Sequence, residues 1–222
     1  MRSRTLFAAA ALFACTAGLA TALTIQDKSK APPPPQDKGK AAPAAAPAAP
    51  PGMDPATAAK MAAYGTPGEE HKMLASKAGK WHGKGKFWMD PAAPAMESEM
   101  DTEYTSIMGG RFLADSTKSD MGGMPFEGHG LTGFDNLSKK YVATWIDKMG
   151  TGIMTMEGTY DAASKTMTLT GNMPDPTVGK ATPMKMITKD TDANSFTMEM
   201  HCTNAKDGKL FKCMDITYTR AK

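Results

Sequence analysis

Apolar and polar side chains alternate over most of the C-terminal two thirds of the chain, in short runs interrupted by Gly, Pro, Asn or Asp. In residues 80–89, for example, Trp81 and Phe87 fall on odd positions, whereas Lys84 and Lys86 fall on even ones. Successive side chains of a strand point to opposite faces of a sheet. A period of two therefore predicts antiparallel strands with one buried face and one wet face.

The alternation predicts about ten strands and one helix. Residues 69–77 form the expected helix, because acidic residues begin it, lysine ends it and a glycine follows. One short helix cannot cover a long sheet, so the sheet has to close on itself or fold into two layers. The short turns favour an antiparallel up-and-down barrel. Besides 80–89, the predicted strands cover residues 99–107, 111–118, 126–134, 140–146, 154–160, 166–170, 184–189, 196–201 and 214–218.

The N-terminal residues 1–22 have the order of a cleaved signal peptide: a basic start, an apolar run and small residues ending at Ala22. The apolar run is too short and too rich in alanine to predict a membrane span. A Leu-Phe-Ala-Cys stretch ending at Cys15 resembles a lipobox, so a lipid anchor at Cys15 is an alternative. Both routes predict an exported protein of the periplasm or cell envelope.

Residues 23–68 are predicted to be a disordered linker rich in proline and alanine. The stretch 31–56 holds 9 of the 16 prolines of the chain and has little apolar surface to bury. Residues 54–64 have the composition to begin a helix, which the Gly-Thr-Pro-Gly sequence at 65–68 would stop. The globular barrel domain is therefore expected to span residues 69–222.

The charge balance of the domain excludes one class of partner. Residues 61–222 carry 19 basic and 20 acidic side chains, and the lysines alternate with acids along the chain. Binding to phosphate backbones requires a basic patch. We therefore expect no nucleic-acid partner.

Short motifs are spread over the predicted domain: EHKML at 70–74, GKW at 79–81, MGGRFL at 108–113, FEG at 126–128, GFDN at 133–136, TWID at 144–147 after Tyr141, EGTYD at 157–161 and ITYTR at 216–220. Together they resemble an exported bacterial family catalogued as a domain of unknown function. The resemblance covers roughly residues 69–220, and it implies no activity and no catalytic residue.

Two further positions are similar to the calycin barrels, such as lipocalins and fatty-acid-binding proteins. Trp81 opens the first strand just after the predicted helix, and Arg220 closes the last strand. In calycins a Trp and an Arg at such positions pack together at the closed end of the barrel. The resemblance therefore implies a calycin-like barrel in which Trp81 and Arg220 are in contact. The other lipocalin motifs are not present.

These observations support the hypothesis of a non-enzymatic barrel that binds a small hydrophobic or amphipathic ligand in its interior, without a cofactor. A barrel of about eight strands can also fill its interior with side chains, so a packed structural domain with no ligand is an alternative. The candidate ligand-binding residues are Trp81, Phe87, Arg111, His129, Trp145 and Tyr160.

Methionine is unusually abundant, with 20 residues, and this supports a second alternative. Thioethers suit copper(I), and methionines on adjacent strands would form a soft-metal site from Met154, Met156, Met198, Met200 and His201. The interpretation we favour is that flexible methionines fill an irregular core. The histidine spacing predicts no zinc site.

No sequence motif supports an enzyme. The chain has no Gly-x-Ser-x-Gly elbow and no phosphate loop. His129 lies in a glycine-rich stretch, and as a proton acceptor it would need an orienting carboxylate, for which Asp135 and Asp147 are candidates only by composition. Four aspartates beside turn residues or strand ends are interpreted as turn formers: Asp135, Asp147, Asp161 and Asp175.

Cys202 and Cys213 would remain after signal cleavage, and paired cysteines are common in exported proteins. A three-residue hairpin loop ending at Gly208 pairs strand residues whose numbers add up to 414. Met200 then lies opposite Met214, and Cys213 lies on the other face from Cys202. This register predicts that the two cysteines are not bonded.

Overall fold

The structure is a computed structural model, and it describes residues 52–120 and 123–222. Two helices precede ten strands along the chain. The helices are α1 (Pro55–Gly65) and α2 (Glu69–Ala75). The strands are β1 (Gly79–Phe87), β2 (Met96–Ile107), β3 (Phe112–Asp120), β4 (Pro125–Asp135), β5 (Lys140–Asp147), β6 (Met154–Asp161), β7 (Thr166–Asp175), β8 (Lys180–Asp192), β9 (Ser195–Thr203) and β10 (Leu210–Arg220).

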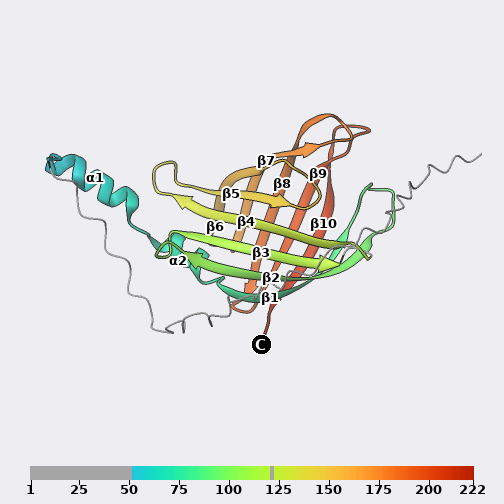
Figure 1. The fold of residues 1–222 in the computed structure, drawn as a ribbon, viewed down its shortest axis with the longest axis horizontal. Helices are drawn as coiled ribbons and strands as arrows, with labels where there is room; N and C mark the ends of the chain where they lie inside the picture. Colours follow the sequence, from blue (N-terminus) through green and yellow to red (C-terminus); the bar gives the residue numbers. More distant parts are fainter. Residues whose placement is uncertain (1–51, 121–122) are drawn as a thin grey trace, which may run out of the picture. The chain divides into compact units, whose positions relative to one another are not determined.

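The strands form a closed antiparallel barrel in which each strand pairs with its neighbours in sequence and β10 pairs with β1. In Figure 1, β2–β5 run across the view and β7–β10 run steeply against them, so the sheet wraps around an interior. Each of the ten strands is paired on both sides, which removes exposed sheet edges. The predicted up-and-down barrel of about ten strands after a short helix is confirmed.

Burial along the strands follows the period of two in the sequence. On β1, Trp81 and Gly83 are buried, whereas Lys80 and Lys84 are exposed. A shift of one residue in pairing would move all of these side chains to the wrong face, so the alternation also fixes the register. The most deeply buried large side chains are Trp81, Leu169 and Ile216.

One end of the barrel is closed by α2 and by the contact that the calycin resemblance implies. The Arg220 guanidinium lies 4.3 Å from the centre of the Trp81 ring. Arg220 also donates hydrogen bonds to the carbonyl oxygens of Ala78 and Ser76, and the Trp81 indole donates to the carbonyl of Lys77. These contacts join the end of α2 to the first and last strands. The implied packing of Trp81 against Arg220 is confirmed.

Helix α1 lies at the end of the predicted linker, where residues 54–64 were expected to have the composition of a helix start. Asp54 caps the helix by accepting hydrogen bonds from the amides of Ala56 and Thr57. No residue of α1 is buried. At its C-terminal end, the Arg111 side chain donates two hydrogen bonds to the carbonyl of Gly65, at 3.0 and 2.7 Å. A local cap and this side-chain clamp therefore order a helix that buries no apolar face.

A disulfide joins Cys202 and Cys213, whose Cα atoms are 5.7 Å apart, so the prediction that they are not bonded was wrong. The predicted register holds beyond the bulge, with Met214 opposite Met200. A β-bulge just before Met214 then shifts the pairing by one residue and places Phe211 opposite Cys202. Bulges redirect side chains, and this one brings Cys213 to Cys202. An alternating pattern does not reveal such an inserted residue.

The predicted signal peptide 1–22, the lipobox alternative at Cys15 and the linker up to residue 51 lie outside the described residues. Within residues 52–120 and 123–222, no helix combines the length and apolar character needed to cross a bilayer.

Candidate functional site

The barrel contains a cavity of about 330 Å³. Inward-facing strand residues line it, together with Met73, Leu74 and Lys77 of the α2 segment. This volume lies near the lower end of the range for small-molecule pockets, which is about 300–1,000 Å³. The wall is mostly apolar, and eleven methionines contribute to it: Met73, Met100, Met149, Met154, Met156, Met167, Met173, Met186, Met198, Met200 and Met214.

The methionines gather on the β6–β10 side because strand alternation repeats there from one strand to the next. Met186, Met200 and Met214 lie directly opposite one another on β8, β9 and β10. Unbranched thioether side chains adapt to irregular spaces, so this wall is deformable. His201 follows Met200 in β9 and points to the other face, where its ring lies 3.3 Å from Glu199.

The opposite wall, formed by β2–β4, carries more polar groups, although Met100, Leu113 and Phe126 also belong to it. Thr102 and Thr117 are both buried, and their hydroxyls are hydrogen-bonded at 2.8 Å. Two residues away along each strand, Asp115 lies opposite Tyr104, and both side chains line the cavity. Burial raises the pKa of the Asp115 carboxyl to about 6, with an opposing effect from His129. Burial also raises the pKa of the Tyr104 phenol well above its usual range.

Two glycines of β4 leave space for large neighbours from the adjacent strands. A Cβ atom on Gly128 would lie 2.2 Å from the Trp145 ring, and one on Gly130 would lie 2.3 Å from the Asp115 carboxylate. Real Cβ atoms do not come this close, so a side chain at either position would displace the Trp145 ring or the Asp115 carboxylate. The bare backbone of β4 therefore allows Trp145 of β5 and Asp115 of β3 to lie across it.

The other charged side chains of the cavity wall have protein partners. Lys77 forms an ion pair with Asp190, near the α2 end. At the other end, Asp147 accepts hydrogen bonds from the Trp145 indole and from the amide of Met149, both at 2.8 Å. These pairings leave the lysine and two of the three aspartates of the wall neutralised or hydrogen-bonded.

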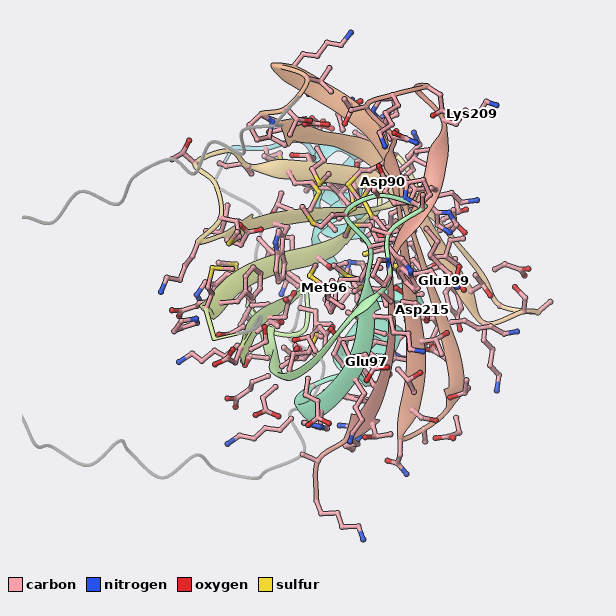
Figure 2. The ribbon with its side chains drawn as sticks, turned by 90° about the vertical axis from the view of Figure 1, so that its right-hand side faces the viewer. Asp90, Met96, Glu97, Glu199, Lys209 and Asp215 are labelled. Carbon is pink, nitrogen blue, oxygen red and sulfur yellow. A yellow bond between two sulfur atoms is a disulfide. The ribbon has the colours of Figure 1, made fainter. Side chains whose placement is uncertain are left out.

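Exposed apolar side chains surround the end of the barrel opposite α2. Met89, Met149 and Ile153 lie in its loops and are 83%, 70% and 69% exposed. Met96, at the start of β2, is also exposed, and Figure 2 labels it together with Asp90 of the β1–β2 loop. This loop is attached to the β9–β10 hairpin by a hydrogen bond from the amide of Trp88 to the carbonyl of Cys213 and by an ion pair of Asp90 with Lys206.

The comparison with family models matches residues 66–220 to the family described as "Protein of unknown function (DUF1579)". The chain belongs to this family. No curated protein sequence matches it.

Two solved structures show that the fold is shared with calycin-like barrels. A crystal structure of Rv2717c from M. tuberculosis has a TM-score of 0.54 at 15% identity, and the match covers 68% of this chain and 96% of that one. The S-type phycobiliprotein lyase CPES from Guillardia theta has a TM-score of 0.50 at 8% identity, covering 69% of this chain and 93% of that one. The predicted calycin-like fold class is confirmed.

The structure brings together three of the six predicted ligand-binding residues. Phe87, Trp145 and Tyr160 line the cavity. The other three lie outside it: Trp81 is part of the closed-end core, Arg111 holds the end of α1, and His129 lies on the outer face beside Glu127. These three residues were selected from the sequence mainly by residue type, and less by whether their strand position points into the barrel.

Asp115 is the cavity residue that the sequence interpretation missed. The sequence contained the information needed to find it. In the strand predicted at 111–118, Asp115 lies two residues from both Leu113 and Thr117 and therefore points to the same, inner face. A carboxylate at an inward-facing strand position is unusual and points to a functional role. Over the described part of the chain, no group of three or more His, Cys, Asp or Glu residues is placed to hold a metal ion.

Proposed function

We propose that this protein binds a small, largely apolar molecule inside its barrel, as a non-enzymatic component of the periplasm or cell envelope. The cavity carries the proposal. A barrel of about eight strands can be filled solid by its own side chains, whereas this ten-stranded barrel retains about 330 Å³ next to flexible methionines. The apolar rim around Met89, Met149 and Ile153 gives an apolar ligand a favourable surface on its way in.

Two features support export. The N-terminal residues have the pattern of a signal peptide. The disulfide between Cys202 and Cys213 is a bond that persists in oxidising compartments and is rare in the cytosol.

Binding can be tested with an uncharged fluorescent probe, N-phenylnaphthylamine, whose emission rises in apolar surroundings. Ser119 lines the cavity, whereas its neighbour Lys118 is exposed on the outer face. We expect Ser119→Trp to abolish probe binding by filling the cavity, and Lys118→Trp to leave it unchanged. Equal binding by both variants would place the probe outside the barrel and contradict the proposal.

A soft-metal function is the second candidate, and one observation favours it. Met186, Met200 and Met214 form a continuous row across three neighbouring strands, and all three line the cavity. Three thioethers are a suitable ligand set for copper(I). Of the metal site predicted from the sequence, Met154, Met156, Met198 and Met200 also line the cavity, whereas His201 lies on the opposite face beside Glu199. Retention of copper(I) through desalting, and its loss in Met200→Leu, would favour this candidate.

A further inference from the structure

Asp115 is the charged side chain of the cavity wall whose partner is missing. Within residues 52–120 and 123–222, its carboxylate accepts no hydrogen bond and joins no ion pair. Lys77, Asp147 and Asp190 also line the cavity, and each of these has a partner on the protein. Partial burial disfavours the charged form of Asp115, and its carboxylate faces the cavity. An unpartnered carboxylate at a cavity wall therefore suggests a partner that arrives with the ligand.

The surroundings of Asp115 leave its carboxylate open to the cavity. Gly130, its partner on β4, has no side chain to cover it, and the backbone there passes close beneath the carboxylate oxygens. On the other side, Tyr104 of β2 lies opposite Asp115 and presents an aromatic ring to the same cavity. The site thus combines a free carboxylate with an adjacent aromatic surface.

The charges of the cavity wall favour a cationic ligand over an anionic one. Three aspartates and one lysine line the cavity, and the lysine is already paired with Asp190. A carboxylate ligand such as a fatty acid would find no free cation among the described lining residues and would be repelled by ionised Asp115. A cationic nitrogen would gain an ion pair with Asp115 and cation–π contacts with the aromatic rings of the wall.

We propose that the ligand is an amphipathic amine, whose cationic nitrogen binds Asp115 and whose apolar part lies against the methionines of β6–β10. This inference rests on the proposed ligand-binding function and specifies the chemical class of the ligand. The polar wall at β2–β4 fixes the orientation of the amine, and the deformable wall accepts its apolar part.

The test uses competition against N-phenylnaphthylamine at pH 8 by three compounds of equal chain length: octylamine, octanol and octanoate. We expect octylamine to displace the probe at a concentration about tenfold below that of octanol, which corresponds to one charge-assisted hydrogen bond. Octanoate is expected to be the weakest competitor. In Asp115→Asn the advantage of octylamine over octanol should disappear, while octanol competes as before.

Glu103→Gln is the matched control. Glu103 precedes Tyr104 on β2 and is exposed on the outer face, so the variant makes the same change in net charge outside the cavity. It is expected to retain the full preference for octylamine. A loss of preference in both variants would show a general electrostatic effect and overturn the assignment of Asp115.

A pH series provides a second readout. The titratable groups near Asp115 are Tyr104 on β2, Tyr218 on β10 and His129 on the outer face of β4. Both tyrosines stay protonated at neutral pH because burial raises the pKa of each phenol. Octylamine should bind about fivefold more weakly at pH 5 than at pH 8 as Asp115 takes up a proton, whereas octanol should not change.

The possible results separate the inference from the function on which it rests. Octanoate competing as well as octylamine, or Asp115→Asn retaining the preference for octylamine, would overturn the amine assignment and leave the binding function intact. If the probe binds neither the wild-type protein nor the Asp115→Asn and Glu103→Gln variants, the binding function is excluded, and the amine assignment with it.

Discussion

The two walls of the barrel cavity differ in chemistry although they belong to one continuous sheet. Besides Met100, Leu113 and Phe126, the β2–β4 wall presents hydroxyls and the carboxylate of Asp115. The β6–β10 wall is dominated by methionines, with Leu169 and Ile216, and its carboxylate, Asp190, is paired with Lys77. The polar wall contains a fixed hydrogen bond between Thr102 and Thr117, and the apolar wall consists of side chains with several rotatable bonds.

This difference separates two tasks of a binding barrel. Polar groups orient a ligand because hydrogen bonds and ion pairs have a preferred geometry. Flexible thioether side chains contribute apolar contact area and adapt to ligands of different shapes. The comparison predicts that substitutions in the apolar wall mainly change the stability of the protein. Substitutions in the polar wall should change the pH dependence of stability and the selectivity of binding.

The largest effect is expected in the apolar wall, at Leu169, which is fully buried and lines the cavity. Leu169→Ala should lower the free energy of unfolding by about 3–5 kcal/mol, because it removes buried apolar surface and enlarges the cavity. Urea denaturation measures the change. The control is Thr170→Ala, an exposed neighbour on β7, which should change the stability by less than about 0.5 kcal/mol. A small loss at Leu169 would show that the apolar wall is not the main source of stability.

Asp115→Asn should have the next largest effect, and in the opposite direction. The pKa of Asp115 is about 6 in the folded protein against 3.8 as its reference value, so the folded state binds the proton more tightly than the unfolded state. The stability of the wild-type protein therefore gains from protonation of Asp115. This gain is complete below the unfolded pKa and is lost as the pH rises through about 6.

Relative to wild type, Asp115→Asn is expected to be more stable at pH 8 by about 3 kcal/mol, and this difference should shrink towards pH 4. Denaturation curves of both proteins across this range measure it. A difference that is independent of pH would contradict the raised pKa of Asp115.

The smallest effect concerns the hydroxyl pair of the polar wall. Thr117→Val should cost about 1–3 kcal/mol, because it leaves the buried hydroxyl of Thr102 without its partner. The double variant Thr102→Val with Thr117→Val should recover most of this loss, since both hydroxyls are then replaced by methyl groups of similar shape. Additive losses in the double-mutant cycle would show that the two hydroxyls are not coupled.

Strand phase made most of the fold predictable from the sequence. Residues such as Trp81 and Phe87 on β1 alternate with lysines, and the same period recurs on the other strands. The disulfide was predicted wrongly because the bulge before Met214 is a local irregularity that alternation does not reveal. A helix start over residues 54–64 was expected from composition, but its attachment to Arg111, which is distant in sequence, was not. The candidate site was half predicted: Phe87, Trp145 and Tyr160 line the cavity, whereas Asp115 was recognised only from its surroundings.

By itself, the sequence determined the number and phase of the strands, the closed antiparallel sheet and the apolar character of its inner face, because alternation and turn residues are local signals. Only the tertiary structure decided that the interior retains a cavity, since the space left depends on how all inward-facing side chains pack together. It also decided that Asp115 lies over Gly130 and opposite Tyr104, without a partner on the described protein. That arrangement requires three strands to be in register, and no local pattern specifies it.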